Sequence, residues 1–284
     1  MSHPAPRPAA VSGALRLEAP AKLNLGLRVV GRRADGLHLL DSVFVLLELA
    51  DRLLLMPGGS GLRVEGDGAD ALPVGDENLA WRGLRAGLDG EPELACLALE
   101  KRIPAAAGLG GGSSDAAAAW RLGRAWRGLS EPADAEDLDA LAGIGADVPF
   151  FASRLAAARV TGIGERVEAL VPELTHVVLA HAPFGLSTTA VFAELRPEDW
   201  GSQHNDLLAP ARRLRPELDG LMSAVTGAGG QPRLSGSGPT IFSLTGDPDR
   251  AVAISERLRD AGVRASITRT RVAAASIERI TEED

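Results

Sequence analysis

The chain has 284 residues, 45% hydrophobic and 24% charged, which is typical of a globular protein with room for one large domain or two ordinary ones. Its net charge of −8 argues against a general nucleic-acid or anionic-membrane binder, and no apolar run is long enough to span a bilayer. The single cysteine, Cys96, cannot form an internal disulfide, so we expect a cytoplasmic protein, and nothing indicates an obligate protein partner.

The first hundred residues are expected to be mainly strands. Residues 1–14 are rich in Pro and Ala and predict a flexible tail. Apolar and polar residues alternate over 15–30, which is typical of a half-buried strand with Lys22 and Asn24 on its polar face. The glycine-rich segment 58–73 predicts a hairpin connection. Further elements are strands over 39–49, 51–56 and 94–100, and a helix over 78–88 that Asp76 or Asn78 caps.

Residues 104–118, which read PAAAGLGGGSSDAAA, form the most informative run of the chain. Its four glycines allow left-handed backbone and close approach to a ligand, while the Ser-Ser-Asp that follows and the alanines predict a capped helix. A loop that opens into a helix directs unpaired N–H groups and the helix dipole at one spot, so we predict phosphate binding here. A flexible glycine linker is the alternative, and the capped helix disfavours it. Neither the Walker lysine nor the third glycine of the dinucleotide fingerprint is present.

The rest of the chain mixes strands and helices without regular alternation, which indicates an α+β fold. Pro149 is expected to keep Val148 extended, so that the turn over 143–149 presents Asp147. A boundary near 155–165 divides the chain into domains over 15–160 and 161–284. Helices are expected over 114–127, 134–142, from 187 or 188, within 205–225 and over 247–261, and strands over 155–160, 166–170, 175–182, 241–244 and 263–268.

Five segments resemble the GHMP kinases, and more closely the branch that acts on 4-diphosphocytidyl-2-C-methyl-D-erythritol in the non-mevalonate isoprenoid pathway. They are APAKLNL over 19–25, RADGLH over 33–38, the glycine loop, GADVP over 145–149 and LSGSGP over 234–239. The resemblance covers about residues 18 to 270. It implies an N-terminal ATP-binding domain like ribosomal protein S5 and a C-terminal ferredoxin-like α/β sandwich, with the active site in the cleft between them.

The resemblance also implies the reaction and its residues. ATP, with Mg²⁺, would phosphorylate the 2-hydroxyl of the cytidyl substrate, with Asp147 as base or hydroxyl orienter and Lys22 polarising that hydroxyl. The residues implied for ATP are Pro104, Ala105, Ala106, Ala107, Gly108, Leu109, Gly110, Gly111, Gly112, Ser113, Ser114, Lys101 and Asn78. Those implied for the substrate are Asn24, Leu37, His38, Asp147, Thr188, Phe192, Ser235, Gly236, Ser237 and Gly238.

Several of these residues have a simpler structural explanation. Ser114 is implied as a Mg²⁺ ligand, yet its hydroxyl can instead cap the helix. Lys101 can be a surface lysine, and Asn78, implied as an adenine ligand, can be a helix cap. Thr188 can cap the helix that begins near it, and 235–238 can be a simple turn before a strand.

The implied cytosine pocket departs from the family at one position. His38 stands where the family reads the cytosine edge, and Phe192 where an aromatic stacks on that base; alone they would be a structural histidine and a core residue. The family usually has tyrosine before the histidine, and this chain has Leu37. Leucine offers no π-face, so the cytosine would stack on one side only. The alternative functions are a homoserine or mevalonate kinase of the same family, or a catalytically silent ligand sensor on the same fold.

Overall fold

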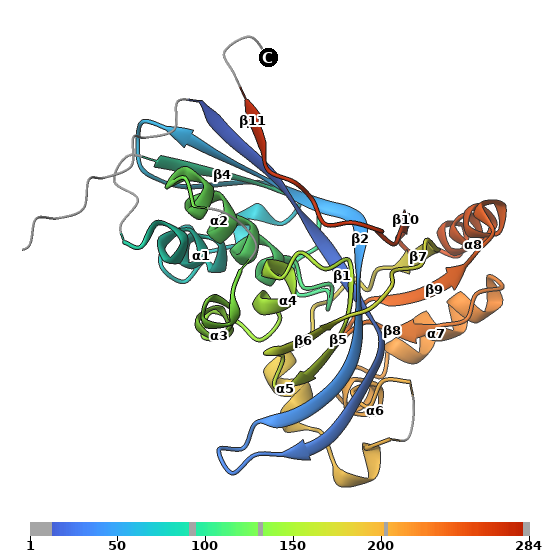
Figure 1. The fold of residues 1–284 in the computed structure, drawn as a ribbon. Coiled ribbons are helices and arrows are strands. Elements are labelled where there is room, and N and C mark those ends of the chain that lie inside the picture. Colours follow the sequence, from blue (N-terminus) through green and yellow to red (C-terminus); the bar gives the residue numbers. More distant parts are fainter. Residues whose placement is uncertain (1–12, 91–94, 130–132, 202–203, 281–284) are drawn as a thin grey trace, which may run out of the picture.

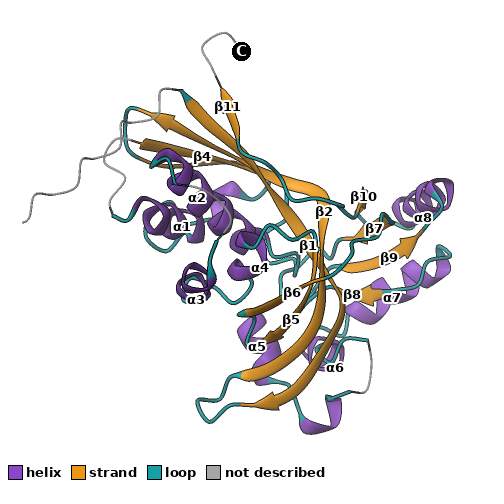
Figure 2. Cartoon of the chain, viewed as in Figure 1, coloured by secondary structure: helices purple, strands orange, loops and turns teal. Residues whose placement is uncertain are grey.

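Two β-sheets with helices packed against them make up the molecule (Figures 1 and 2). The computed structural model describes residues 13–90, 95–129, 133–201 and 204–280. Of the tail expected over 1–14, residues 1–12 lie outside the described residues, and the end of that expectation is wrong because Ala14 already begins the first strand. Seven strands form the first sheet in the order β11-β1-β2-β4-β3, with β5 pairing β2 and β6, and four form the second in the order β10-β7-β9-β8. The α+β prediction is confirmed. No helix of the described ranges is long and apolar enough to cross a membrane.

Strands and helices of the first sheet come mostly from the first 169 residues. Its strands are β1 (Ala14–Arg32), β2 (His38–Pro57), β3 (Gly61–Gly66), β4 (Ala95–Lys101), β5 (Ala157–Gly162), β6 (Arg166–Ala169) and β11 (Glu278–Ile280). The accompanying helices are the 3₁₀ turn η1 (Ala69–Ala71), α1 (Leu79–Leu88), α2 (Gly111–Trp126), α3 (Ala135–Ala142) and α4 (Val148–Ala152).

The second sheet carries the remaining helices. Its strands are β7 (His176–Ala180), β8 (Arg233–Leu234), β9 (Ile241–Thr245) and β10 (Ala265–Arg269). The helices are α5 (Thr188–Ala193), the 3₁₀ turn η2 (Pro197–Asp199), α6 (Leu208–Leu214), α7 (Leu218–Gly227) and α8 (Pro248–Asp260).

The long antiparallel pair β1 and β2 carries several residues of the site. Register shifts at Pro20/Lys22, Asn24/Gly26 and Val29/Gly31 mark bulges, which bend a strand and redirect its side chains. The pair curves from the α1–α2 layer down toward α5 and α6 (Figure 1). Two expected strands over 39–49 and 51–56 are in fact one, because β2 runs unbroken through Ala50.

Two further expectations are wrong, and one strand was not predicted. The segment 58–73 is not a plain hairpin connection, because it contains β3, which pairs in parallel with β4 across the intervening α1. Val148 is not extended: it begins α4, since Pro149 is tolerated in a first helical turn where its missing N–H is not needed. The last strand, β11, was not expected at all, and it pairs with β1.

Close packing of α1 on α2 places the start of α2 next to β1 and β2. Gly83 and Gly87 of α1 lie against the backbone of α2, where a Cβ would overlap the carbonyl groups of Ala116 and Trp120. The alanine-rich face of α2 is in turn buried, with Ala116, Ala117 and Ala119 at most 1% exposed. The two helices can therefore approach only because their facing residues are small.

The division at residue 160 stays a prediction. That position lies within β5, which pairs with β2 on one side and β6 on the other, so the first sheet extends through Ala169. After β10 the chain returns to the first sheet, where the Arg271 side chain donates to the Leu47 carbonyl oxygen and the Glu18 carboxylate. The strand pairing favours a division between the two domains after β6. The segment after β10 then belongs to the first sheet again, although it follows the second in the sequence.

Candidate active site

A cavity of about 980 Å³ gathers most of the predicted site residues. Its walls come from β1, β2, the loop between β4 and α2, the start of α4, and α5. The predicted residues that line it are Lys22, Asn24, Leu37, His38, Asn78, Lys101, Pro104, Ala105, Ala106, Ala107, Gly108, Leu109, Gly110, Gly111, Gly112, Ser113, Asp147, Thr188, Phe192, Gly236 and Ser237. Ser114, Ser235 and Gly238 are not among the lining residues, and they lie behind the wall.

Lys22 and Asp147 form an ion pair in the wall of this cavity. Lys22 Nζ lies 3.2 Å from Asp147 Oδ2 and donates to Asn24 Oδ1 over 2.7 Å, and it also lies 4.5 Å from the Phe44 ring centroid. The lysine side chain is 5% exposed, whereas that of Asp147 is 29% exposed and faces the open cavity. The ammonium is thus fixed from several sides, while the carboxylate is accessible to a ligand.

The Asn24 amide is itself oriented. Its Nδ2 donates to Ser42 Oγ over 2.9 Å, and that hydroxyl donates to the Gly26 carbonyl oxygen over 2.5 Å. Since the Asn24 Oδ1 is then turned toward Lys22, Asn24 serves in this structure to hold the ammonium. A direct substrate contact of Asn24 stays a prediction.

The glycine loop has the left-handed backbone that its composition predicts. Gly108 and Gly110 have φ of 74° and 72°, and a Cβ on Gly108 would lie 2.8 Å from the Gly238 carbonyl oxygen. Gly110 is the N-cap of α2, and the helix begins at Gly111 without a side-chain cap. The Lys22 N–H donates to the Leu109 carbonyl oxygen over 2.9 Å and ties the loop to β1. Gly111, Gly112 and Ser113 line the cavity, and the N–H groups of a first helical turn have no partner within the helix, as an anion site requires.

The two serines after the glycines differ in their surroundings. Ser113 lines the cavity, whereas Ser114 is 1% exposed and its Oγ has no hydrogen-bond partner among the described residues. Ser114 therefore does not cap α2 with its side chain, because the cap position belongs to Gly110. Within the described ranges no cluster of three or more His, Cys, Asp and Glu side chains is suited to a metal ion.

Mg²⁺ nevertheless fits the oxygen atoms present here. This ion is usually held by one or two carboxylates together with substrate phosphates and water, so it does not need a complete cage of protein ligands. The Asp147 carboxylate and the Ser113 hydroxyl face the cavity, and the partnerless Ser114 Oγ lies one residue further on. The assignment of Ser114 as metal ligand stays a prediction.

Lys101 is not a surface lysine. It ends β4, is 5% exposed, and its ammonium contacts the carboxylates of Asp51 and Asp115, with Nζ 2.7 Å from Asp115 Oδ2. Asp51 Oδ1 also accepts from the N–H groups of Arg102 and Ile103 over 2.6 and 2.8 Å. This buried cluster, Asp51–Lys101–Asp115, joins the strand before the glycine loop to the helix after it. Nothing in the local sequence indicates that either aspartate contacts Lys101.

Two carboxyl groups share one ammonium in the Asp51–Lys101–Asp115 cluster. Burial, with the neighbouring Asp51 charge, raises the pKa of Asp115 to about 8 against the lowering effect of Lys101. Burial also works to lower the pKa of Lys101, but the two carboxylates outweigh it and the pKa stands raised. Lys101 therefore keeps its positive charge, and Asp115 holds a proton more readily than an exposed aspartate does.

Asn78 acts as the helix cap that the sequence allowed. Its Oδ1 accepts from the Ala80 N–H over 2.9 Å, and its Nδ2 donates to the Pro73 carbonyl oxygen over 2.7 Å. The residue still lines the cavity beside the glycine loop. A contact of Asn78 with adenine stays a prediction.

An aromatic pocket forms the far end of the cavity. The rings of His38 and Phe192 are stacked, with centroids 5.4 Å apart, and the Trp200 ring meets His38 edge-on at 6.4 Å. Leu37 lines the cavity and is 48% exposed. Burial and the Arg32 charge lower the pKa of His38, so its neutral imidazole can both donate and accept a hydrogen bond. Trp200 was missed, because nothing in the local sequence relates it to position 38.

The loop over 235–238 supports the cavity from behind. Ser235 Oγ donates to the Gly108 carbonyl oxygen over 2.9 Å, and Ser237 Oγ lies 2.8 Å from Thr188 Oγ1. Asn205, a further residue that the sequence analysis missed, donates from Nδ2 to the carbonyl oxygens of Leu234 and Gly236. The cap of α5 is Ser187 rather than Thr188, which leaves the Thr188 hydroxyl on Ser237.

Comparison with known proteins relates both halves of the chain to one family. The family model described as GHMP kinases N terminal domain matches residues 78–154, and the one described as GHMP kinases C terminal matches residues 190–264. The chain is 43% identical over 263 residues to 4-diphosphocytidyl-2-C-methyl-D-erythritol kinase of Granulibacter bethesdensis, covering 82% of this chain and 86% of that protein. The enzyme of that name from Thermus thermophilus is 41% identical over 264 residues, covering 85% and 91%.

Solved structures agree with this relation. A crystal structure of 4-(cytidine 5'-diphospho)-2C-methyl-D-erythritol kinase aligns with a TM-score of 0.74 at 36% identity, covering 90% of this chain and 98% of the other. Homoserine kinase from Cytophaga hutchinsonii aligns with a TM-score of 0.66 over 95% and 98% of the two chains. Its identity is only 17%, so this second likeness shows the fold alone.

Proposed function

Because the chain belongs to the 4-diphosphocytidyl-2-C-methyl-D-erythritol kinases of the GHMP family, we propose that it moves the γ-phosphate of ATP to the 2-hydroxyl of that substrate. The products are the 2-phosphate and ADP, which places the reaction in non-mevalonate isoprenoid synthesis. The chain is thus an ATP-dependent small-molecule kinase. The observation that carries the proposal is the meeting of Lys22 and Asp147 beside the start of α2 in one cavity.

The acceptor hydroxyl belongs next to Asp147. Its carboxylate accepts the hydrogen bond of the 2-hydroxyl and so turns an oxygen lone pair toward the γ-phosphate. Lys22, held between Asp147 and Asn24, adds a positive charge that stabilises this arrangement as negative charge develops. Whether Asp147 removes the proton or only orients the hydroxyl does not alter this placement.

The phosphates of ATP belong at the glycine loop. The N–H groups over 110–113 and the dipole of α2 attract their negative charge, and the absence of side chains on the glycines allows close approach. Mg²⁺, when bound with ATP, would neutralise charge on the phosphate oxygens, with the hydroxyl of Ser114 or Ser113 as its protein ligand. The cytidyl end then reaches the aromatic pocket, where His38 can bond the base edge and Phe192 can stack on it.

Release of ADP is the first measurement, with Mg-ATP and the cytidyl substrate run beside homoserine and mevalonate. Turnover with the cytidyl substrate alone is expected, because only that acceptor has a base for the His38 pocket. Turnover with homoserine or mevalonate would overturn the acceptor and keep the fold. Bound ATP without turnover of any acceptor would favour a silent ligand sensor.

The role of Asp147 has its own test. Asp147→Asn is expected to lower kcat about 10²- to 10⁴-fold, the usual contribution of a positioned acid–base group, and to leave ATP binding unchanged. Asp139→Asn, at an exposed aspartate of α3, is the matched control. A kcat for Asp147→Asn close to that of the control would contradict the role.

A further inference from the structure

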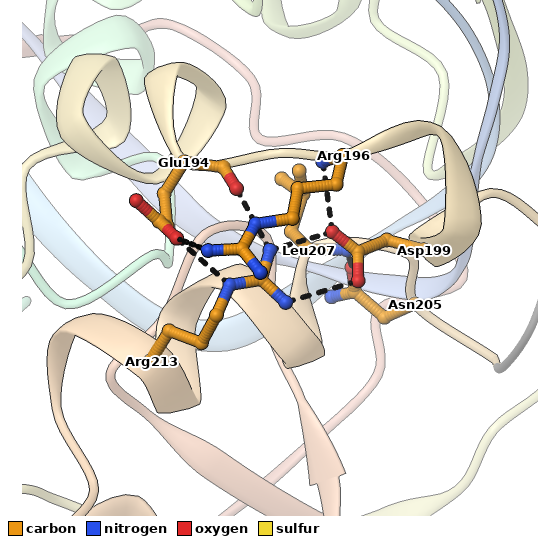
Figure 3. A network of polar contacts seen from close by, with 6 residues as sticks. All are labelled: Glu194, Arg196, Asp199, Asn205, Leu207 and Arg213. Atoms are coloured by element: carbon orange, nitrogen blue, oxygen red, sulfur yellow. Dashed lines mark hydrogen bonds and ion pairs between the residues drawn. The ribbon is translucent and has the colours of Figure 1, made fainter.

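A clamp of ion pairs joins Arg213 to Glu194 and Asp199, and Figure 3 shows these residues. Arg213 of α6 donates from Nε to Glu194 Oε1 over 2.9 Å, and from its two terminal nitrogens to the two Asp199 carboxylate oxygens over 3.1 and 2.6 Å. It also donates to the Glu194 carbonyl oxygen over 2.7 Å. The planar guanidinium thus fixes the residue just after α5 and the last residue of η2 at once.

Asp199, one of the partners of Arg213, is itself buried and fixed by a further hydrogen bond. Asp199 is 5% exposed, and its carboxylate also accepts from the Arg196 N–H over 2.8 Å. The hydrogen bond from Arg213, more than any other contact, lowers the pKa of Asp199, so the carboxylate stays charged. Within the described residues, the cavity wall includes none of Arg213, Glu194 and Asp199, so the clamp acts without touching a ligand.

The clamped segment carries two of the rings that surround His38. Phe192, two residues before Glu194, stacks on the His38 ring, and Trp200, the residue after Asp199, contacts its edge. The other end of α5 is held by the Thr188–Ser237 contact. Since α5 has only six residues, its position depends on its surroundings, which include these two anchors and the apolar core against which Val191 and Phe192 pack.

We propose that Arg213 is a positioning residue for acceptor specificity, which holds α5 and η2 so that Phe192 and Trp200 fix the His38 ring. This role rests on the proposed function. It matters more in this chain than in one with an aromatic residue at position 37, because Leu37 provides no second ring for the base. A base that stacks on one face only depends on the exact placement of the remaining ring.

The test compares Arg213→Met with Arg212→Met. Arg212 is the neighbouring residue of α6 and pairs with Asp219 at the surface, so it controls for loss of a guanidinium from this helix. KM for the cytidyl substrate, KM for ATP and kcat are measured for both, together with calorimetric binding of cytidine diphosphate. Arg213→Met is expected to raise KM for the cytidyl substrate and Kd for cytidine diphosphate about tenfold. This factor lies near the lower end of the loss of affinity expected when a base–aromatic stacking contact is removed.

In the same variant KM for ATP should change less than twofold, and Arg212→Met should resemble the wild type. Arg213→Lys, which cannot pair with both Asp199 oxygens, should lie between, and it replaces Arg213→Met if that variant does not fold. An unchanged KM for the cytidyl substrate, or equal rises for both substrates, would overturn the inference. Lack of turnover by the wild type would instead overturn the proposed function, so the two failures are distinct.

Discussion

Replacing Lys101 by methionine tests whether the Asp51–Lys101–Asp115 cluster holds the glycine loop in place. The substitution keeps the length and apolar stem of the side chain and removes its charge. It leaves the carboxylates of Asp51 and Asp115, which are at most 3% exposed, without the cation between them. Asp51 retains its two backbone N–H donors, whereas one Asp115 oxygen has no partner among the described residues even before the change.

The size of the effect follows from burial. Removing one partner of a buried ion pair usually costs about 3–5 kcal/mol, a large part of the roughly 5–15 kcal/mol that keeps a protein folded. For a chain of this size the loss corresponds to a fall in Tm of roughly 10 °C. Because Asp51 also fixes the start of the loop through Arg102 and Ile103, KM for ATP should rise as well.

Thermal unfolding and ATP kinetics are measured on Lys101→Met, on the double variant Lys101→Met/Asp115→Asn, and on Arg102→Met. The double variant replaces the Asp115 carboxyl, which already holds a proton at neutral pH because its pKa is raised to about 8, by a neutral amide, so its Tm should lie close to that of Lys101→Met. Arg102→Met is the control, since that guanidinium pairs with Glu100 at the surface, where such pairs contribute little. A Tm for Lys101→Met within about 2 °C of wild type, or a double variant less stable than the single one, would refute the reasoning.

Two further substitutions test neighbouring parts of the site. The pKa of Asp115, raised to about 8 from 3.8, means that the folded chain binds more protons than the unfolded chain between these values. This group therefore makes the free energy of unfolding decrease as pH rises through that window, by up to about 1.4 kcal/mol per pH unit. In Asp115→Asn the denaturant midpoint, measured from pH 5 to 8, should decrease less steeply with pH than in the wild type. Leu37→Tyr should lower KM for the cytidyl substrate about tenfold by adding a second stacking face, with KM for ATP as the internal control; an unchanged or raised value would contradict the stacking argument.

The parts of the site that the sequence predicted are those carried by short contiguous segments. The glycine loop, the alternation that pairs Lys22 with Asn24, and the turn before Asp147 each follow from local rules of backbone and side-chain direction. The same is true of most helices and strands. The missed parts depend on contacts between distant segments: β3 pairs with β4 beyond α1, β11 returns to β1, and Trp200 reaches His38 from 162 positions further along the chain.

Local patterns also failed for residues whose role depends on their partners. Asp115 looks like one more polar residue in a helical first turn, and Asp51 like a charge at the end of an apolar strand. Only the fold brings them to Lys101. Asn78 shows the reverse case, because the capping rule alone predicts the hydrogen bond that its Oδ1 accepts from the Ala80 N–H.

One signal in the composition does point to the centre of the site. The chain contains only two lysines, Lys22 and Lys101, and arginine supplies every other basic side chain except histidine. Both lysines are buried against the cavity, at 4% and 5% exposure. An ammonium is a compact charge that a narrow site can surround, as Asn24, Asp147 and Phe44 surround Lys22, whereas the wide planar guanidinium suits the forked clamp of Arg213. In a chain that uses arginine wherever either cation would serve, lysine stands where the shape of the charge matters.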